Sequence, residues 1–455
     1  MAGIAVIGAG MGSLAAAARL ATAGHRVTVY ERSTTYGGGV ARFERDGFGF
    51  DTGPGLLHLP AVYRDLFIKT GKGGKEPLEQ CVSLTQVDPA SRHVFADGTA
   101  VSLPNASRGG VAAALDAALG PGAGERWNGL LGRAREVWEA TRRPLLEDAL
   151  AQDVLPLGRD PYPALRRPLR RRPTTLAEVG RRELRDPRLA ALLGSYAQAY
   201  GFDPGTVPAS AAVLPYMEQT FGTWYVGGGM RALADAVYER CVARGVEFRF
   251  GAEVAGEVLE KAGRAAGVEL ADGTRVEADA VVSGVPPREH SGTGTGRLVV
   301  CLALRGARGA DAVHRTVVHD ERHVVTVLRP DDPALRPDEG HEAVTLTVTV
   351  PWAVPVPSSA AVDADHLLAV AEAAVPELRL GERLLWRELR PSPGPVSRPA
   401  LAGAGGAFLH PANRSPLPGL YRVGGWSHPG GGLAHTGMSA AIVADLIAGG
   451  PGGSR

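Results

Sequence analysis

Glycines and one acidic residue near the N-terminus have the spacing of a dinucleotide-binding turn. Gly8, Gly10 and Ser13 occupy the three positions of a G-x-G-x-x-G pattern, and Glu31 follows about twenty residues later. Gly8 permits a tight turn, and Gly10 lets a pyrophosphate approach the backbone. Ser13 replaces the third glycine but is small enough for close helix–strand packing. A carboxylate at Glu31 can accept hydrogen bonds from a ribose hydroxyl, so the pattern predicts a dinucleotide site.

Three histidines could do acid–base chemistry. His428 and His435 lie in a stretch at residues 421–441 that reads "YRVGGWSHPGGGLAHTGMSAA", and His58 lies in "GPGLLHLP". Imidazole titrates near neutral pH, which makes each histidine a candidate general base. A hydrogen bond from each ring to a backbone carbonyl is the alternative interpretation. Glycine costs about 0.5–1 kcal/mol per site relative to alanine in regular structure, so this stretch indicates backbone that something else approaches closely.

Two strands and a helix are predicted to position the N-terminal turn. The apolar run "GIAVIGAG" predicts a buried strand, and "SLAAAARLATAGH" predicts an alanine-rich helix that stops at Gly24. "RVTVYE" predicts a second strand that ends at the acidic residue. Met11 and Gly12 precede this helix and are expected to contact the cofactor, and the helix N-terminus would offer unpaired amides and positive potential to a pyrophosphate.

The segment after the second strand resembles FAD-dependent oxidoreductases of the amine oxidase and phytoene desaturase superfamily. It reads "ERSTTYGGGVARFERDGFGFDTGPGLL", with a glycine pair and an "FDTGP" motif at the positions that the superfamily uses. The resemblance recurs at residues 221–254, 271–287 and 418–447. Relatives usually carry Arg or Lys where this chain has Gly39, and Arg42 is a candidate to replace that cation.

This resemblance implies FAD as the cofactor. The glycines of residues 430–432 would let the backbone lie against the flavin ring, and the helix that follows would point its N-terminus at the ring. Residues implied to contact FAD beyond the N-terminal turn are Arg32, Gly38, Gly39, Gly53, Pro54, Val254, Gly424, Gly425, Gly432 and Leu433.

The expected fold is α/β: a Rossmann-type FAD-binding domain with an inserted substrate domain of mixed sheet and helices. Residues 1–75, 220–290 and 405–455 are expected to form the FAD-binding domain, and 76–219 and 291–404 the substrate-binding domain. Apolar spacing near 3.6 residues predicts helices in the first insert, and runs such as "RLVVCLALRG" and "EAVTLTVTVP" predict strands in the second. A sheet with helices above it would enclose an apolar tunnel over the flavin. "SGTGTGR" at 291–297 precedes a strand and is expected to be a loop.

The implied activity is desaturation or dehydrogenation of a long, largely apolar polyene, isoprenoid or polyketide-like molecule. A hydride would pass to flavin N5, and quinone or oxygen would then accept the electrons. Relatives carry Thr or a small apolar residue in place of His58 and His435, which predicts a substrate more polar than a plain carotene. His428 is common among relatives and is expected to shape the flavin loop.

Three other functions stay open for this sequence. One is a flavin-dependent isomerase or cyclising oxidoreductase, and a second is a non-catalytic prenyl-lipid-binding escort protein. An amine oxidase, the third, would need an aromatic cage, for which only Trp426 and the aromatic residues at 221–225 are available. The complete dinucleotide pattern argues against the escort protein.

Composition limits the partners and the compartment. Among 455 residues, 44% are hydrophobic and 21% charged, and the net charge of +1 gives no reason to expect nucleic acid as a partner. Three widely spaced cysteines form no metal or disulfide pattern and are expected to be buried in a reducing cytoplasm. We find no targeting signal and no bilayer-spanning run, which predicts a cytoplasmic protein.

One arginine cluster, "LRRPLRRRP" at 165–173, stands out from this balance. It is either a solvated loop or a peripheral contact with an anionic membrane, which would suit a lipid-soluble substrate.

Overall fold

A five-stranded parallel sheet forms around the N-terminal βαβ unit. The computed structural model describes residues 1–74, 76–151, 153–163, 173–286, 293–353, 363–392 and 395–449. The strands lie in the order β10 (Glu247–Phe250), β2 (Arg26–Glu31), β1 (Gly3–Ile7), β14 (Ala280–Ser283) and β20 (Leu420–Arg422). All four pairs are parallel, so the ends of the strands that precede the candidate site meet at one edge of the sheet.

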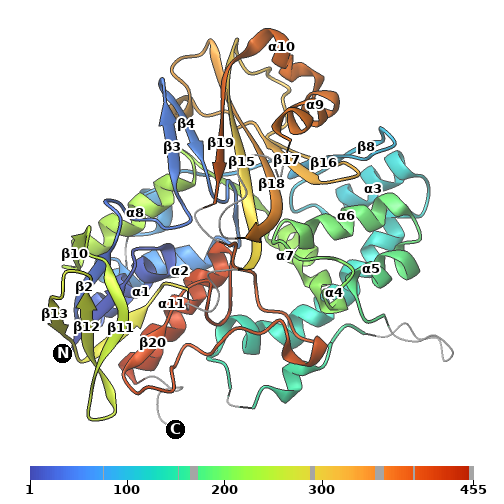
Figure 1. Cartoon of the computed structure of the whole chain (residues 1–455). Helices are drawn as coiled ribbons and strands as arrows, with labels where there is room; N and C mark the ends of the chain where they lie inside the picture. Colours follow the sequence, from blue (N-terminus) through green and yellow to red (C-terminus); the bar gives the residue numbers. More distant parts are fainter. Residues whose placement is uncertain are drawn as a thin grey trace.

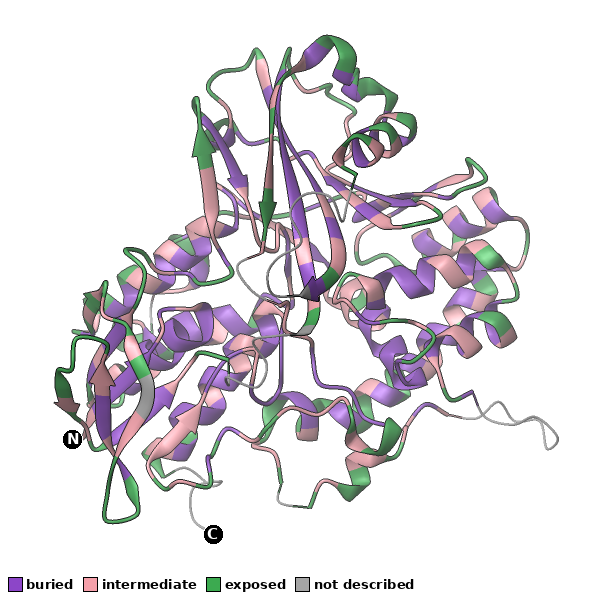
Figure 2. Cartoon of the chain, viewed as in Figure 1, coloured by how far each residue is buried: buried purple, intermediate pink, exposed green. Residues whose placement is uncertain are grey.

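Alternating side chains of β1 pack on two different layers. Ile4 and Val6 face a core shared with four helices, α1 (Met11–Thr22), α2 (Ala61–Thr70), α8 (Met230–Ala243) and α11 (Leu433–Ala448). Ala5 and Ile7 face the small antiparallel sheet of β11 (Val254–Lys261), β12 (Arg264–Leu270) and β13 (Arg275–Glu277). Both faces of the parallel sheet are therefore covered, and its central strands β1 and β14 are almost wholly apolar because both of their sides are buried (Figures 1 and 2).

A mixed seven-stranded sheet stands above this layer (Figure 1). Its order is β19 (Leu384–Pro391), β15 (Thr293–Arg305), β18 (His341–Ala353), β17 (Val324–Leu328), β16 (Arg315–His319), β7 (Ser91–Val94) and β8 (Ala100–Leu103). Leu298, Val300 and Leu302 pack on one face against α9 (Ala364–Ala374) and α10 (Leu380–Arg383). The alternate residues of β15 face the interior of the molecule, because successive side chains of a strand point to opposite sides.

Helices form a third part of the molecule, on the far side of the seven-stranded sheet from α8 (Figure 1). They are α3 (Arg108–Leu119), α4 (Ala123–Arg142), α5 (Leu176–Val179), α6 (Pro187–Gln198) and α7 (Val213–Phe221). Their apolar faces surround the fully buried Trp127, which confirms the helical spacing read from this region.

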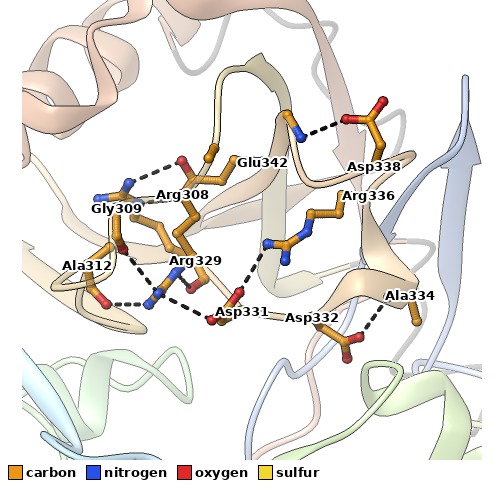
Figure 3. A network of polar contacts seen from close by, with 12 residues as sticks. Arg308, Gly309, Ala312, Arg329, Asp331, Asp332, Ala334, Arg336, Asp338 and Glu342 are labelled. Atoms are coloured by element: carbon orange, nitrogen blue, oxygen red, sulfur yellow. Dashed lines mark hydrogen bonds and ion pairs between the residues drawn. The ribbon is translucent and has the colours of Figure 1, made fainter.

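Short strands join these parts. A hairpin of β3 (Arg42–Arg45) and β4 (Phe48–Asp51) packs its phenylalanines under β15, and β9 (Thr223–Val226) lies between β5 (Leu57–His58) and β6 (Leu84–Gln86). A buried ion pair fixes the connection from β17 to β18, where Arg329 Nε lies 2.7 Å from Glu342 Oε1 (Figure 3). In the same connection Asp332 accepts hydrogen bonds from the hydroxyl of Tyr225 at 2.7 Å and from the amide of Gly228 at 2.6 Å.

Two expectations from the sequence are wrong, and a third lies outside the described residues. The described part of "SGTGTGR" belongs to β15 because its backbone pairs with β18, and Gly296 makes room there for the ring of Trp352. Cys241 and Cys301 are buried, but Cys81 is exposed. Of the arginine cluster at 165–173, residues 165–172 lie outside the described part of the chain. Among the described residues, no helix is long and apolar enough to cross a membrane.

Candidate functional site

The carboxylate of Glu31 holds the turn between β1 and α1. Its Oε2 accepts a hydrogen bond from the amide of Ala9 at 2.6 Å, and its Oε1 accepts one from the amide of Ser33 at 2.8 Å. Glu31 is still half-buried and not fully enclosed, so it can accept further hydrogen bonds from a ligand. The acidic residue predicted from spacing therefore lies directly beside the glycine turn.

The first turn of α1 offers unpaired backbone donors. Its N-cap is Gly10, which has no side chain to accept from the amides of Met11, Gly12 and Ser13. A Cβ at Gly10 would meet nothing within 4 Å, whereas Gly8 has a φ of +84° that favours glycine. Behind the turn, Ser13 packs so closely on Gly284 that a Cβ there would overlap its hydroxyl.

Glycines from three distant segments meet at this turn. A Cβ at Gly38 would lie 3.0 Å from Gly10 Cα, and one at Gly12 would lie 2.8 Å from Gly424 Cα. Space is open at Gly39 and at Gly424, where a Cβ would meet nothing within 4 Å. The backbones of segments 8–13, 37–39 and 424–425 therefore meet at this turn, and we call the open space beside Gly10, Gly39 and Gly424 the hollow.

Two of the glycines predicted to contact FAD are also required by packing within the protein. A Cβ at Gly53 would overlap the carbonyl oxygen of Gly39, and one at Gly425 would overlap the side chain of Ser397. At both positions a side chain would collide with neighbouring protein atoms, so only glycine fits. Pro54 is half-buried beside Gly53.

The segments of the chain that are expected to hold the adenosine lie close together. The amide of Ala252 donates to the carbonyl of Glu31 at 2.9 Å, so β11 begins at Val254 close to the end of β2. Arg32 is exposed at this end. Arg42, the candidate replacement for a cation at Gly39, donates instead to the carbonyl of Ala334 at 2.8 Å.

A second helix N-terminus lies near the first. The N-cap of α11 is Gly432, with a φ of +97° and no side-chain cap, so the amides that begin with Leu433 lack intrahelical partners. Helix α11 packs along α1, and Thr436 approaches Gly12. Two uncapped helix ends, open glycines and one carboxylate acceptor together fit an anionic dinucleotide.

His428 lies in the core and is held in place. It is fully buried, and its Nε2 lies 3.0 Å from the carbonyl oxygen of Asp148. Burial lowers its pKa to about 4, so the ring is neutral at pH 7. These contacts agree with a role in shaping the loop.

His435 forms one wall of a narrow, half-open pocket. Helix α4 contributes Val137 and Trp138 to this pocket, α7 contributes Met217, and most of the lining is apolar. Burial lowers the pKa of His435 to about 4, so this ring is also neutral. The pocket reaches the first turn of α11, to which His435 belongs.

His58 belongs to a partly buried polar group that the sequence analysis did not identify. Its Nε2 lies 3.7 Å from Glu218 Oε2, and Glu218 Oε1 accepts a hydrogen bond from Arg315 Nη1 at 2.6 Å. Burial lowers the pKa of His58 and outweighs the opposing effect of Glu218. Glu218 itself has a lowered pKa, because Arg315 and His58 outweigh the effect of burial. Arg315 carries the one sequence signal for this group, a lone charge in the apolar strand "RTVVH".

The aromatic residues at 221–225 have other contacts. Trp224 donates to the carbonyl of Phe221 at 3.0 Å and lies under the guanidinium of Arg64, 5.2 Å from its ring centre. The hydroxyl of Tyr225 is held by Asp332.

Residues 14–308 match the family of flavin containing amine oxidoreductases. The chain is 29% identical to the 4,4'-diapolycopene oxygenase of Methylomonas sp, over 97% of this chain and 97% of that protein. It is also 29% identical to the hydroxyneurosporene desaturase of Cereibacter sphaeroides, over 97% of this chain and 98% of that protein.

Solved structures share the fold at low sequence identity. A putrescine oxidase with bound putrescine has a TM-score of 0.66 at 15% identity, over 98% of this chain and 99% of that chain. An oxidoreductase from Methanosarcina mazei has a TM-score of 0.63 at 18% identity, over 97% of this chain and 100% of that chain. These likenesses confirm the expected fold class: a Rossmann-type dinucleotide domain combined with a mixed sheet and helices.

Proposed function

The chain belongs to the flavin containing amine oxidoreductases, and from this premise we propose that it desaturates a long, largely apolar polyene. It is an FAD-dependent oxidoreductase, and its relatives over nearly the whole length are named for carotenoid oxidation. The observation that carries the substrate class is the narrow apolar pocket that ends at His435 and the N-terminus of α11. A slender unsaturated chain fits this lining better than a charged amine does.

The dinucleotide would lie across the edge of the parallel sheet. Glu31 would accept from the ribose, and the amides at Met11 and Gly12 would donate to the pyrophosphate. The N-terminus of α11, at Gly432 and Leu433, would stabilise negative charge at the flavin ring. Residues 1–75, 220–290 and 405–455 form the FAD-binding domain in this proposal, and residues 76–219 and 291–404 hold the substrate.

Bound FAD supplies a hydride acceptor at N5 of its ring. The apolar side chains of α4 and α7 exclude water from the pocket and align the substrate chain. His435 is neutral at pH 7 and faces the pocket, so its ring can accept the proton that leaves the neighbouring carbon. His58 is the second candidate for this proton, because Glu218 lies beside it and would stabilise the charged ring.

The electron acceptor and the route of the substrate complete the proposal. Quinone or oxygen would reoxidise the protein after each turnover. A polyene is lipid-soluble, so the substrate would enter from a membrane that the protein contacts peripherally.

Anaerobic mixing tests this function. The purified yellow protein is mixed with polyenes in detergent, and absorbance near 450 nm and product mass are followed. Bleaching together with a product lighter by two hydrogens per step is the expected result. A product of unchanged mass would indicate isomerisation instead of desaturation. A protein that takes up no FAD would contradict the proposal.

A further inference from the structure

The interior face of the seven-stranded sheet carries polar side chains near the start of β15, whereas further along β15 it packs on the phenylalanines of the β3–β4 hairpin. Arg297 pairs across the sheet with Thr349, and Val299 pairs with Thr347, which in turn pairs with Thr326. These residues lie on the side opposite to Leu298 and Val300, whose side chains pack toward α9. An interior surface with arginine and threonine is unusual for a tunnel that holds only hydrocarbon.

The segment around Tyr200 is fixed against this polar face. Thr295 donates to the carbonyl of Gly201 at 3.1 Å, and Thr349 donates to the carbonyl of Gln198 at 3.3 Å. Tyr200 therefore lies between two residues that are hydrogen-bonded to β15 and β18, the strands on which Arg297 and its partner Thr349 lie. Its ring also borders the start of α11, because a Cβ at Gly432 would lie 3.4 Å from its Cε1.

Two guanidinium groups lie at this end of β15 without a carboxylate. Arg297 has no hydrogen bond or ion pair from its side chain to any residue that the structure describes, and burial lowers its pKa. Arg398 donates to Thr295 Oγ1 at 2.7 Å and stacks on Phe202, but no described carboxylate pairs with it. Burial lowers the pKa of Arg398 as well. An uncompensated charge is costly in such a place, so the site favours an anion.

The hydroxyl of Tyr200 adds a donor to the same place. It has no hydrogen-bond partner among the described residues, and burial raises its pKa to about 12, so it stays protonated. The carboxylate that acts on Tyr200, Glu218 of α7, is already paired with Arg315. Positive charge is thus in excess at this end of the face.

We propose that Arg297, Arg398 and Tyr200 form a subsite for a carboxylate at one end of the apolar substrate. A guanidinium fork matches the two oxygens of a carboxylate, and the tyrosine hydroxyl supplies a third donor. The substrate class is then a polyene acid, with its chain in the apolar pocket and its charged end against β15. This inference rests on the proposed polyene oxidoreductase function and narrows it.

Calorimetry on the oxidised FAD-loaded protein tests the subsite without turnover. The probes are all-trans-retinoic acid, its methyl ester and retinal. We expect wild-type protein to bind the acid about 10- to 100-fold more tightly than the ester, since hydrogen bonds to charged groups are the strong ones. R297Q should reduce the affinity for the acid to the level of the affinity for the ester. The affinity for the ester itself should not change.

R305Q is the matched control, because Arg305 lies on the same strand but is exposed. Equal affinity of wild-type protein for acid and ester would overturn the proposal, and this measurement does not depend on any variant folding. Retinal binding as tightly as the acid would identify a carbonyl site instead. Loss of FAD from R297Q would make Arg297 a cofactor contact, which also overturns the proposal.

The two proposals fail separately. A protein that selects the acid but never oxidises a polyene would refute only the proposed function. One that oxidises polyenes without preferring the acid in the binding assay would refute only the subsite.

Discussion

Adding a single methyl group at Gly10 should weaken FAD binding without disturbing the protein itself. Gly10 has a φ of −73°, which alanine adopts readily, and its Cβ would meet nothing within 4 Å. The space into which that Cβ points is the hollow assigned to the pyrophosphate. Gly10→Ala therefore tests FAD binding separately from the stability of the protein.

The magnitude follows from the hydrogen bonds at the N-terminus of α1. A hydrogen bond to a charged group contributes about 1.5–3 kcal/mol, and displacing the pyrophosphate from one amide would forfeit about that much. Each 1.4 kcal/mol changes an affinity tenfold, so we expect the FAD dissociation constant to rise about 10- to 100-fold. The apoprotein should unfold as the wild type does.

Gly12→Ala is the matched comparison, since the new Cβ would lie 2.8 Å from Gly424 Cα, a backbone atom. Overpacking of this kind costs about 1–3 kcal/mol, so this apoprotein should be less stable. FAD affinity is measured by titrating apoprotein and following flavin fluorescence, and stability by urea unfolding of apoprotein. Wild-type FAD affinity in Gly10→Ala, or equal apoprotein stability in both variants, would refute the arrangement of glycines described above.

Four further changes test other parts of the site. Glu31→Gln should weaken FAD binding about tenfold or more in the same titration, because a charged acceptor is lost; unchanged affinity would place the ribose elsewhere. Glu218→Gln should destabilise the protein by about 3–5 kcal/mol in urea, because Arg315 stays buried without its partner, while the double variant E218L/R315M should recover much of this loss. The pKa of His435 is about 4 in the fold and 6.5 in its ordinary range, so the unfolded chain binds the proton more readily. Stability should therefore fall between about pH 6.5 and 4 by about 3 kcal/mol for this residue, and His435→Gln should make the urea midpoint less sensitive to acid. His58→Ala and His435→Ala should slow anaerobic flavin bleaching by a polyene about 100-fold if their ring is the base, with bound FAD intact; wild-type rates in both variants would exclude both histidines.

Local sequence was sufficient for the fold of the N-terminal βαβ unit. The strand at Arg26–Glu31 was predicted with its observed bounds, and α1 begins at Met11, two residues before the predicted helix. Such features are set by contacts within about thirty residues, where turn geometry and apolar periodicity leave few alternatives. The likeness to known oxidoreductases then placed the distant glycines of the closing loop.

The substrate half depended on contacts that sequence spacing does not encode. "SGTGTGR" was expected to be a loop because it precedes a strand, yet pairing with β18 makes its described part the start of β15. The partners of His58 come from α7 and β16, 160 and more positions further along the sequence.

The sequence by itself determined the βαβ unit that places two glycines beside Glu31, because these groups lie in one continuous segment. Only the tertiary structure decided which face of β15 Arg297 occupies and that no described carboxylate meets it. Strand register and sheet packing set that face, and they depend on the whole chain being folded.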